Sequence, residues 1–316
     1  MLRPPTPGQL ARVIDSIVQA RGYFLIDGAT ATSLEARGCT LHPSLWSAGL
    51  VATDPGAIRQ LHLDYLKAGA DCITTVSYQA SAEGLLQAGF TDGEVESLLR
   101  TSVDLALEAR QQFFDSGGEG AALVAASIGP FGAMRADGSE YRGNYGVDAS
   151  ELYRFHAERL RILAHTPADI LACETIPDAA EAGVLLELMG QYARRGFWLS
   201  LSCPNGESLA DGTPVETIVS MAADTPNLVA IGFNCMAPEF ACGLIHRARQ
   251  AAPDMRVLVY PNSGEVWNAS QRCWQDSASP AVFAHEASHW LEAGACLIGG
   301  CCRTTPETIA GLRASA

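Results

Sequence analysis

The chain has 316 residues, 48% of them hydrophobic and 18% charged, so it can bury a large core and is too apolar to be disordered. Its formal net charge of -14 at pH 7 argues against nucleic acids and anionic membranes as partners, because both repel an acidic surface. A small-molecule partner is the remaining expectation.

The start of the chain is polar and rich in proline, and it lacks the apolar core of a secretion signal. No run of about 18 apolar residues, the length that spans a membrane, follows it. We therefore expect a cytoplasmic protein. In that reducing compartment most of the ten cysteines would be buried free thiols, and Cys72, Cys173 and Cys296, which fall within apolar runs, are predicted to be plain core residues.

Eight short apolar runs are predicted to be β-strands. In chain order they cover residues 23–27, 72–75, 123–127, 170–174, 197–202, 229–234, 256–261 and 295–300. Helical patterns follow them, and the first is clearly marked, because Asp54 caps it, Pro55 takes its first position and Gly69 follows its end. The predicted helices cover residues 54–67, 92–114, 148–165, 178–194, 214–223, 237–250, 281–292 and 306–314.

Eight strands, each paired with a helix in one unbroken series, favour a TIM-like (β/α)8 barrel over an open doubly wound sheet. No linker or shift in composition divides the chain, so residues 1–316 are predicted to form a single domain with its core at about 22–312. In such barrels the active site lies at the carboxyl ends of the strands. The candidates are therefore the polar residues that end the predicted strands: Asp27, Thr75, Ser127, Glu174, Ser202, Asn234, Cys235, Asn262, Cys301 and Cys302.

Three cysteines at strand ends are candidate metal ligands. Cys301 and Cys302 are adjacent at the end of the last predicted strand, and Cys235 follows the sixth. Cysteine thiolates are soft ligands that select zinc, and a site with three of them leaves the fourth tetrahedral position open for a substrate. The adjacent pair could equally be a strained disulfide, a redox sensor or two packed thiols, and sequence spacing leaves these alternatives open.

The histidines and the glycine-rich loops are not assigned a chemical role. Histidines on predicted helices are expected to be solvated or partly buried, among them His62, His156, His165 and His246. The glycine-rich loops lack the spacing of a P-loop or a dinucleotide fingerprint, so no nucleotide cofactor is indicated. The loop 129–147 is instead predicted to be a lid or pocket wall over the barrel mouth, with Tyr141 and Tyr145 packed in it.

Asp27 and Glu174 are the two carboxylates among the strand-end candidates. Each could act as a general acid or base, or could hold a substrate ammonium group. Asp27 could instead cap the helix that follows it, whereas the helix after Glu174 is expected to begin only after Pro177. A metal-bound thiol ionises without help from a protein base, so neither carboxylate has to serve as one.

Nine segments along the chain resemble the homocysteine S-methyltransferase family. They span about residues 22 to 312 and read, in order, DGA from 27, LWSA from 45, AGADCITTVSYQA from 68, SIGP from 127, ADGSEYRGNY from 136, CETIP from 173, GFNC from 232, YPNSGE from 260 and GGCCRTTP from 299. The likeness is greatest to the bacterial members that use S-methylmethionine as methyl donor.

The resemblance implies a zinc-dependent (β/α)8 barrel with one zinc ion per chain. Homocysteine would fill the open position of the zinc site through its sulfur, so that the metal ligands are also the catalytic residues. The implied ligands are Cys235, Cys301 and Cys302. The implied contacts to the amino acid part of homocysteine are Asp27, the backbone at Gly28 and Glu174, with Thr75 as a further member. Ser127 and Asn234, which end their predicted strands, are also predicted to bind substrate.

We therefore expect an enzyme that transfers a methyl group from S-methylmethionine, or from S-adenosylmethionine, to homocysteine and forms methionine. Two departures from the family pattern leave the donor open: Ser33 replaces an expected acidic residue, and residues 202–208 differ from an expected charged loop. The alternatives are a zinc-thiolate redox-sensing or binding protein without methyl transfer, and a barrel with packed cysteines and no metal. No protein partner is inferred.

Overall fold

Eight parallel strands form a barrel in the computed structural model, which describes residues 4–268, 273–275 and 279–315. Their order is β1, β10, β7, β6, β5, β4, β3 and β2, and a bridge between Ile26 and Cys72 joins the two ends of this series. The strands are β1 Phe24–Leu25, β2 Cys72–Thr74, β3 Leu123–Ile128, β4 Ile170–Ile176, β5 Phe197–Leu201, β6 Leu228–Asn234, β7 Val257–Tyr260 and β10 Leu297–Ile298. The predicted (β/α)8 barrel is confirmed, with each strand in its expected place.

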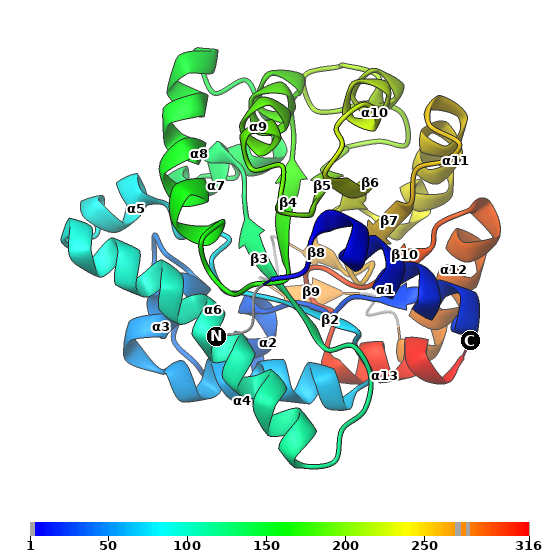
Figure 1. The fold of residues 1–316 in the computed structure, drawn as a ribbon, viewed down its shortest axis with the longest axis horizontal. Helices are drawn as coiled ribbons and strands as arrows, with labels where there is room; N and C mark the ends of the chain where they lie inside the picture. The colour runs from blue at the N-terminus through cyan, green and yellow to red at the C-terminus, as the bar shows by residue number, and fades with distance from the viewer. Residues whose placement is uncertain (1–3, 269–272, 276–278, 316) are drawn as a thin grey trace.

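Helices surround the strands and connect them (Figure 1). The predicted ones are α4 Pro55–Lys67, α6 Asp92–Asp115, α8 Ala149–Leu163, α9 Ala179–Gln191, α10 Val215–Ala223, α11 Ala241–Ala251, α12 Pro280–Ala293 and α13 Pro306–Ala314. Helix α4 begins where expected because Oδ1 of Asp54 accepts the N–H of Ala57 at 3.0 Å. Helix α11 begins later than expected, after the 3₁₀ turn Pro238–Phe240. None of the described helices has both the length and the apolar character of a membrane span.

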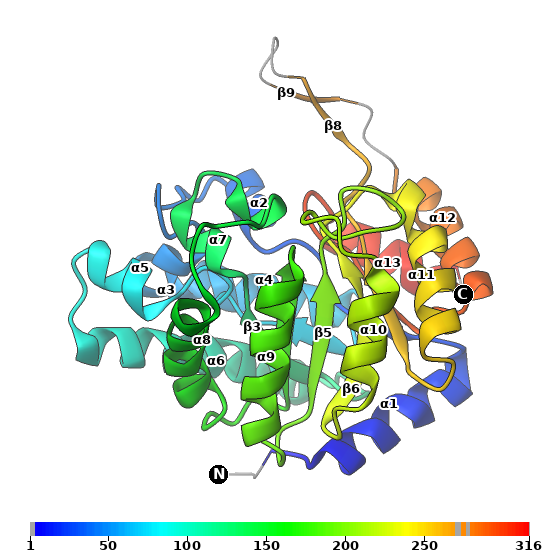
Figure 2. The ribbon, with the colours of Figure 1, turned by 90° about the horizontal axis from the view of Figure 1, so that it is seen from above.

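Several elements lie outside the predicted set. They are α1 Pro7–Arg21, α2 Ala31–Ala36, α3 Leu50–Thr53, α5 Ala82–Gln87, α7 Phe131–Arg135, the 3₁₀ turns Ser47–Gly49 and Ser139–Tyr141, and strands β8 Val266–Asn268 and β9 Cys273–Gln275. All except α1 lie between a barrel strand and its main helix, so they build up the carboxyl side of the barrel. Strands β8 and β9 pair as an antiparallel hairpin that extends beyond the barrel on this side (Figure 2).

Helix α1 lies across the opposite end of the barrel (Figure 2). A capping box between Thr6 and Gln9 starts this helix. Leu10 and Ile14 are fully buried and belong to the apolar cluster that fills the barrel interior, which also contains Trp198. A second, larger cluster occupies the space between the strands and the outer helices. The amino end of the barrel is therefore closed by apolar packing.

The three cysteines predicted to be core residues differ in burial. Cys72 and Cys173 are fully buried, as expected. Cys296, which precedes β10, packs against the interior cluster but keeps partial exposure.

Gly232 marks a close approach between β6 and β7. An added β-carbon at this residue would lie 1.7 Å from the carbonyl oxygen of Leu258, which is its partner in the ladder between the two strands. The obstacle is backbone held in a hydrogen-bonded ladder, which cannot move aside as a flexible side chain would. Only glycine fits here without moving a strand.

Gly232→Ala is therefore expected to lower the free energy of unfolding by about 3 kcal/mol, because the added methyl group overpacks this strand junction. Urea unfolding measures the change. Gly190→Ala is the matched control, since Gly190 lies in α9 with open space around its potential β-carbon, and alanine there should stabilise the helix by up to about 1 kcal/mol. Equal stability of Gly232→Ala and the wild-type protein would contradict this packing.

Candidate active site

One pocket at the carboxyl ends of the strands brings together the residues predicted from the sequence to bind metal or substrate. Its lining includes Asp27, Gly28, Thr75, Ser127, Glu174, Asn234, Cys235, Cys301 and Cys302. The other two strand-end candidates lie outside this lining. Ser202 is buried and donates its N–H to the carbonyl oxygen of Ile176, whereas Asn262 supports the cysteine pair from behind. The individual roles of these residues stay predictions.

The three cysteine sulfurs form a compact cluster. The Sγ atoms of Cys235, Cys301 and Cys302 all lie within 4.8 Å of one another, and those of Cys235 and Cys302 are 3.6 Å apart. Cys235 is buried, and the other two are half-buried at the pocket. Such a cluster could hold a metal ion, with the pocket on its open side.

The end of β7 holds both cysteine segments in place. The N–H of Cys235 donates to the carbonyl oxygen of Tyr260 at 3.3 Å, and the N–H of Cys302 donates to Oδ1 of Asn262 at 3.1 Å. Cys235 itself has a left-handed φ of +55°, which is uncommon for a residue with a side chain. Backbone strain of this kind is found where a functional group must be aimed, and here it lies at the turn out of β6.

The three thiols alter one another's affinity for protons. Hydrogen bonds from Cys235 and Cys301 lower the pKa of Cys302 well below its ordinary value. Hydrogen bonding with Cys235 and Cys302 raises the pKa of Cys301 well above its ordinary value. The thiols therefore hold their protons with unequal strength, and a soft divalent ion would displace the remaining protons on binding.

Asp27 is a carboxylate at the end of β1 that is only 2% exposed. Its Oδ2 accepts the N–H of Thr74 at 2.8 Å, and its Oδ1 accepts the Thr74 hydroxyl at 3.0 Å. The alternative role as a helix cap is wrong, because the residue in the N-cap position of α2 is Thr30. Burial raises the pKa of Asp27 well above its ordinary value, despite the hydrogen bonds from Thr74.

Glu174 is the second buried carboxylate of the pocket, at 8% exposed. Its Oε1 accepts the hydroxyl of Ser127, and its Oε2 accepts the hydroxyl of Tyr260 at 3.0 Å. The strand bulges here, since the register between β4 and β5 shifts between Cys173 and Ile176. Burial raises the pKa of Glu174 above its ordinary value. Both carboxylates would therefore gain from a positively charged ligand.

Comparison with known proteins decides the family. Residues 24–316 match the family model described as homocysteine S-methyltransferase. The chain belongs to the homocysteine S-methyltransferase family. It is 42% identical to the homocysteine S-methyltransferase of Escherichia coli K12, over 95% of this chain and 97% of that protein. A selenocysteine Se-methyltransferase of Brassica oleracea is 40% identical, over 91% of this chain and 87% of that protein.

A solved structure supports the same assignment for this member of the homocysteine S-methyltransferase family. The crystal structure of the homocysteine methyltransferase MmuM from Escherichia coli, in its metallated form, matches with a TM-score of 0.86 at 40% identity, over 96% of this chain and 99% of that one. The resemblance read from sequence motifs is confirmed, and so is the fold. The protein is therefore an enzyme of the methyltransferase class.

The other three predicted substrate contacts, Thr75, Ser127 and Asn234, already have hydrogen-bond partners within the protein. Oγ1 of Thr75 lies 2.7 Å from the hydroxyl of Ser77 and accepts the N–H of Ser127 at 3.1 Å. The Ser127 hydroxyl donates to Glu174. Oδ1 of Asn234 accepts the N–H of Thr175 and the hydroxyl of Ser200, both at 2.8 Å. These contacts favour a role in holding the pocket walls over direct contact with substrate.

The pocket also contains residues that the strand-end rule misses. Thr74 and Tyr260 are the last residues of β2 and β7, and their side chains bind the two buried carboxylates. Trp46, Tyr78 and Tyr141 come from the segments after β1, β2 and β3. The strands predicted from the sequence run one residue further, to 75 and 261, so the rule selects Thr75 and Asn262 and passes over Thr74 and Tyr260. The aromatic residues in these loops were the available signal.

Asp27→Asn is expected to make the substrate-free enzyme more stable than the wild type at neutral pH. The pKa of Asp27 in the folded protein lies above its unfolded value, so its contribution to stability is complete below the unfolded pKa and is lost as pH rises through the folded pKa. Urea unfolding at about pH 5 and about pH 8 measures the difference in free energy of unfolding between the variant and the wild type. As pH rises, this difference should grow in favour of the variant by up to about 1.4 kcal/mol per pH unit.

Asp115→Asn, a change at the exposed end of α6, is the matched control and should follow the wild type at both pH values. Parallel pH profiles for Asp27→Asn and the wild type would show that burial of this carboxylate carries no such penalty.

Proposed function

We propose that this enzyme transfers a methyl group from a sulfonium donor, S-methylmethionine or S-adenosylmethionine, to the thiolate of L-homocysteine, with methionine as product. The observation that carries the proposal is a cluster of three cysteine sulfurs in the same pocket as two buried carboxylates. Relatives named as homocysteine S-methyltransferases support the choice of acceptor. Small-molecule substrates without a protein partner, and a cytoplasmic location, belong to the same proposal.

Cys235, Cys301 and Cys302 would hold one zinc ion. Two sulfurs on a tetrahedral zinc ion, each about 2.3 Å from the metal, are about 3.8 Å apart. The 3.6 Å between the sulfurs of Cys235 and Cys302 is close to this value. Thiolates also select zinc over hard cations such as magnesium. When bound, zinc supplies one piece of chemistry, which is to keep a thiol in its fourth position ionised at neutral pH.

Asp27 and Glu174 would bind the amino acid part of homocysteine. Each is buried, and burial raises the pKa of each above its ordinary value. A substrate ammonium group would supply the opposite charge that stabilises their ionised forms. The hydroxyl groups of Ser127 and Tyr260 orient Glu174, while Thr74 orients Asp27. This arrangement would hold the acceptor by its amino acid end and leave its thiol free to reach the cysteine cluster.

Aromatic side chains would face the methyl donor. Trp46, Tyr78 and Tyr141 line the pocket, and the Tyr141 hydroxyl lies 3.4 Å from Sγ of Cys235, so this wall stands beside the sulfur cluster. The faces of aromatic rings attract cations, and a sulfonium is a cation that keeps little hydration. A positively charged donor is therefore better matched to this wall than a neutral one.

The residues around the pocket would contribute alignment and the exclusion of water. The homocysteine sulfur forms a bond to the methyl carbon as the bond from that carbon to the donor sulfur breaks, and the electron pair of the broken bond stays on the donor sulfur. Opposite charges cancel in the transition state, so a site that excludes water favours it. Holding the three reacting atoms in line is the larger contribution, because it replaces a bimolecular encounter.

Cys301→Ser is expected to leave much less than one zinc ion per chain and to slow methionine formation by more than about 100-fold, because a hydroxyl is a poor ligand for a soft site. Elemental analysis of the purified protein and an assay for methionine measure the two effects. Cys242→Ser, at a half-buried cysteine in α11, is the control and should keep the zinc content and the rate of methionine formation of the wild type. Unchanged methionine formation in Cys301→Ser, or after complete removal of zinc, would reject the proposed mechanism.

A panel of donors with homocysteine as acceptor would identify the methyl source. S-methylmethionine should yield two methionines for each homocysteine consumed, because the demethylated donor is itself methionine. S-adenosylmethionine should yield one methionine and one S-adenosylhomocysteine. The sequence motifs favour S-methylmethionine, so we expect it to have the higher kcat/KM. A higher value for S-adenosylmethionine would overturn this choice of donor, and no methionine from either would overturn the function.

A further inference from the structure

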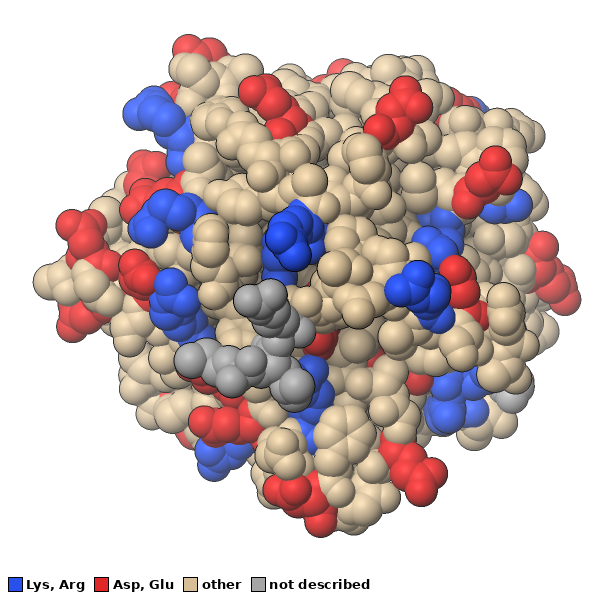
Figure 3. Space-filling view, in the orientation of Figure 1, with Lys and Arg blue, Asp and Glu red and all other residues tan. Residues whose placement is uncertain are grey.

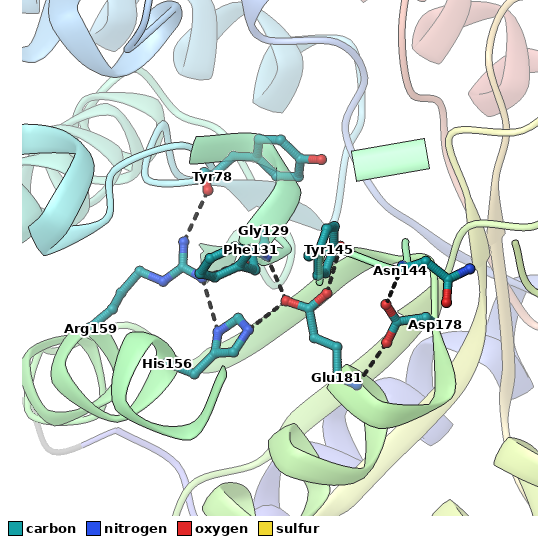
Figure 4. A network of polar contacts seen from close by, with 9 residues as sticks. All are labelled: Tyr78, Gly129, Phe131, Asn144, Tyr145, His156, Arg159, Asp178 and Glu181. Carbon is teal, nitrogen blue, oxygen red and sulfur yellow. Dashed lines mark hydrogen bonds and ion pairs between the residues drawn. The ribbon is translucent and has the colours of Figure 1, made fainter. Parts of the chain in front are cut away.

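Arg159, His156 and Glu181 form a buried polar network between α8 and α9, behind the pocket wall (Figure 4). Their exposed fractions are 1%, 0% and 0%, and they do not belong to the pocket lining. The expectation of a solvated or partly buried His156 is wrong, because a carboxylate on the neighbouring helix gives the ring a partner inside the protein. We call these three residues the buried clamp.

Hydrogen bonding fixes the protons of the buried clamp. Arginine has only donors, so the 3.1 Å contact between Nη2 of Arg159 and Nδ1 of His156 requires Nδ1 to accept. The imidazole proton is then on Nε2, which donates to Oε1 of Glu181 at 2.7 Å. Burial lowers the pKa of His156 and keeps the ring neutral, and it lowers the pKa of Arg159 only to about 10. A neutral ring therefore links a cation to an anion.

The cationic end of the clamp binds two backbone segments that enter the pocket. Nη1 of Arg159 donates to the carbonyl oxygen of Tyr78 at 3.1 Å, and Nη2 donates to that of Gly129 at 2.5 Å. Tyr78 follows β2, and Gly129 starts the loop 129–147 after β3. These two segments also touch each other, since an added β-carbon at Gly129 would lie 2.6 Å from the Tyr78 oxygen. One guanidinium group therefore sets their relative position.

The anionic end of the clamp holds the same loop at both of its ends. Oε1 of Glu181 accepts the N–H of Phe131 at 2.5 Å, and Oε2 accepts the hydroxyl of Tyr145 at 2.8 Å. Asp178, the N-cap residue of α9, accepts the N–H of Asn144 at 3.2 Å and that of Glu181 at 2.9 Å (Figure 4). Tyr145 packs in the loop, as the sequence predicts, and it also fastens the loop to α9.

The loop 129–147 packs tightly against itself between the two ends that the clamp holds. An added β-carbon at Gly132 would lie 2.4 Å from the backbone nitrogen of Glu140, so the first turn of the loop packs directly against its middle. That middle contributes Glu140 and Tyr141 to the pocket lining, as expected for a pocket wall. A shift at the ends is therefore transmitted to Tyr141, whose hydroxyl lies beside the sulfur of Cys235.

We infer that Arg159, His156 and Glu181 are positioning residues for methyl transfer, which fix Tyr78 and Tyr141 as the donor-facing wall of the pocket. The inference rests on the proposed function, because it assigns that wall to the sulfonium donor. Misplacement of a reacting group by about 1 Å can slow a reaction by about 100-fold, so a support that lies outside the pocket can still control the rate.

A purely structural role for the buried clamp makes a different prediction. Removal of the charge on Glu181 leaves a buried guanidinium without its anion, which lowers stability in either case. With a structural role alone, the molecules that remain folded keep wild-type kinetic constants. With a positioning role, the folded enzyme itself uses the donor less well. Binding of homocysteine should change little, because Asp27 follows β1 and Glu174 lies in β4, so neither belongs to the loop.

Glu181→Gln tests the inference, because it keeps the shape of the side chain and removes its charge. Methionine formation is measured with homocysteine and S-methylmethionine varied in turn, at a temperature where a thermal melt shows the variant to be folded. We expect kcat/KM for the donor to fall by at least about tenfold, while KM for homocysteine stays within about twofold of the wild type. Glu187→Gln, exposed on the same helix, is the matched control and should keep both constants.

Wild-type constants in folded Glu181→Gln, or equal losses for donor and acceptor, would overturn the inference. If Glu181→Gln does not fold, Tyr145→Phe decides, because it removes a single hydroxyl from the same carboxylate. A selective loss toward the donor in that variant supports positioning, and wild-type constants refute it. If the wild-type protein forms no methionine from any sulfonium donor, the proposed function fails and the inference fails with it. If the wild type is active and the variants keep its constants, the inference alone fails.

Discussion

The register between parallel strands is the constraint on which the site depends. Asn234 pairs with Tyr260 across β6 and β7, and Ile298 pairs with Val259 across β7 and β10. Strand β7 thus lies between the two segments that carry cysteines, and the residues after each strand emerge at the same level. This is how Cys235 comes to face a cysteine pair far along the chain. A slip of one residue in either ladder would turn side chains to the opposite face of the sheet and disperse the sulfurs.

The pocket gathers ionisable groups whose burial is electrostatically unfavourable. Two carboxylates are buried in it, and burial raises the pKa of both. Three thiols lie together beside them and shift one another's pKa values in opposite directions. Groups of this kind lower the stability of the empty protein and gain interactions when ligands arrive, as is common at functional sites. The apolar clusters inside and outside the barrel supply the stability that offsets them.

The parts of the molecule that sequence predicts are those with local signals. Apolar runs mark the strands, and Asp54 with Pro55 marks the start of α4, all within a few residues of the element concerned. The clustered cysteines are predictable because they end such runs. The buried clamp had no local signal, since His156 and Glu181 look like ordinary helix positions and meet only after folding. Helix α1 does carry a local signal, the capping box at Thr6, but it precedes β1 and so lies outside the repeating series of strand and helix.

The closed amino end of the barrel limits how substrates enter and products leave. Leu10 and Ile14 of α1 fill the end of the barrel opposite the pocket, so molecules must come and go through the mouth on the carboxyl side. The acceptor, the donor and both products then pass through the same opening. In the proposed reaction the product nearest the mouth therefore has to leave before the product bound deeper in the pocket.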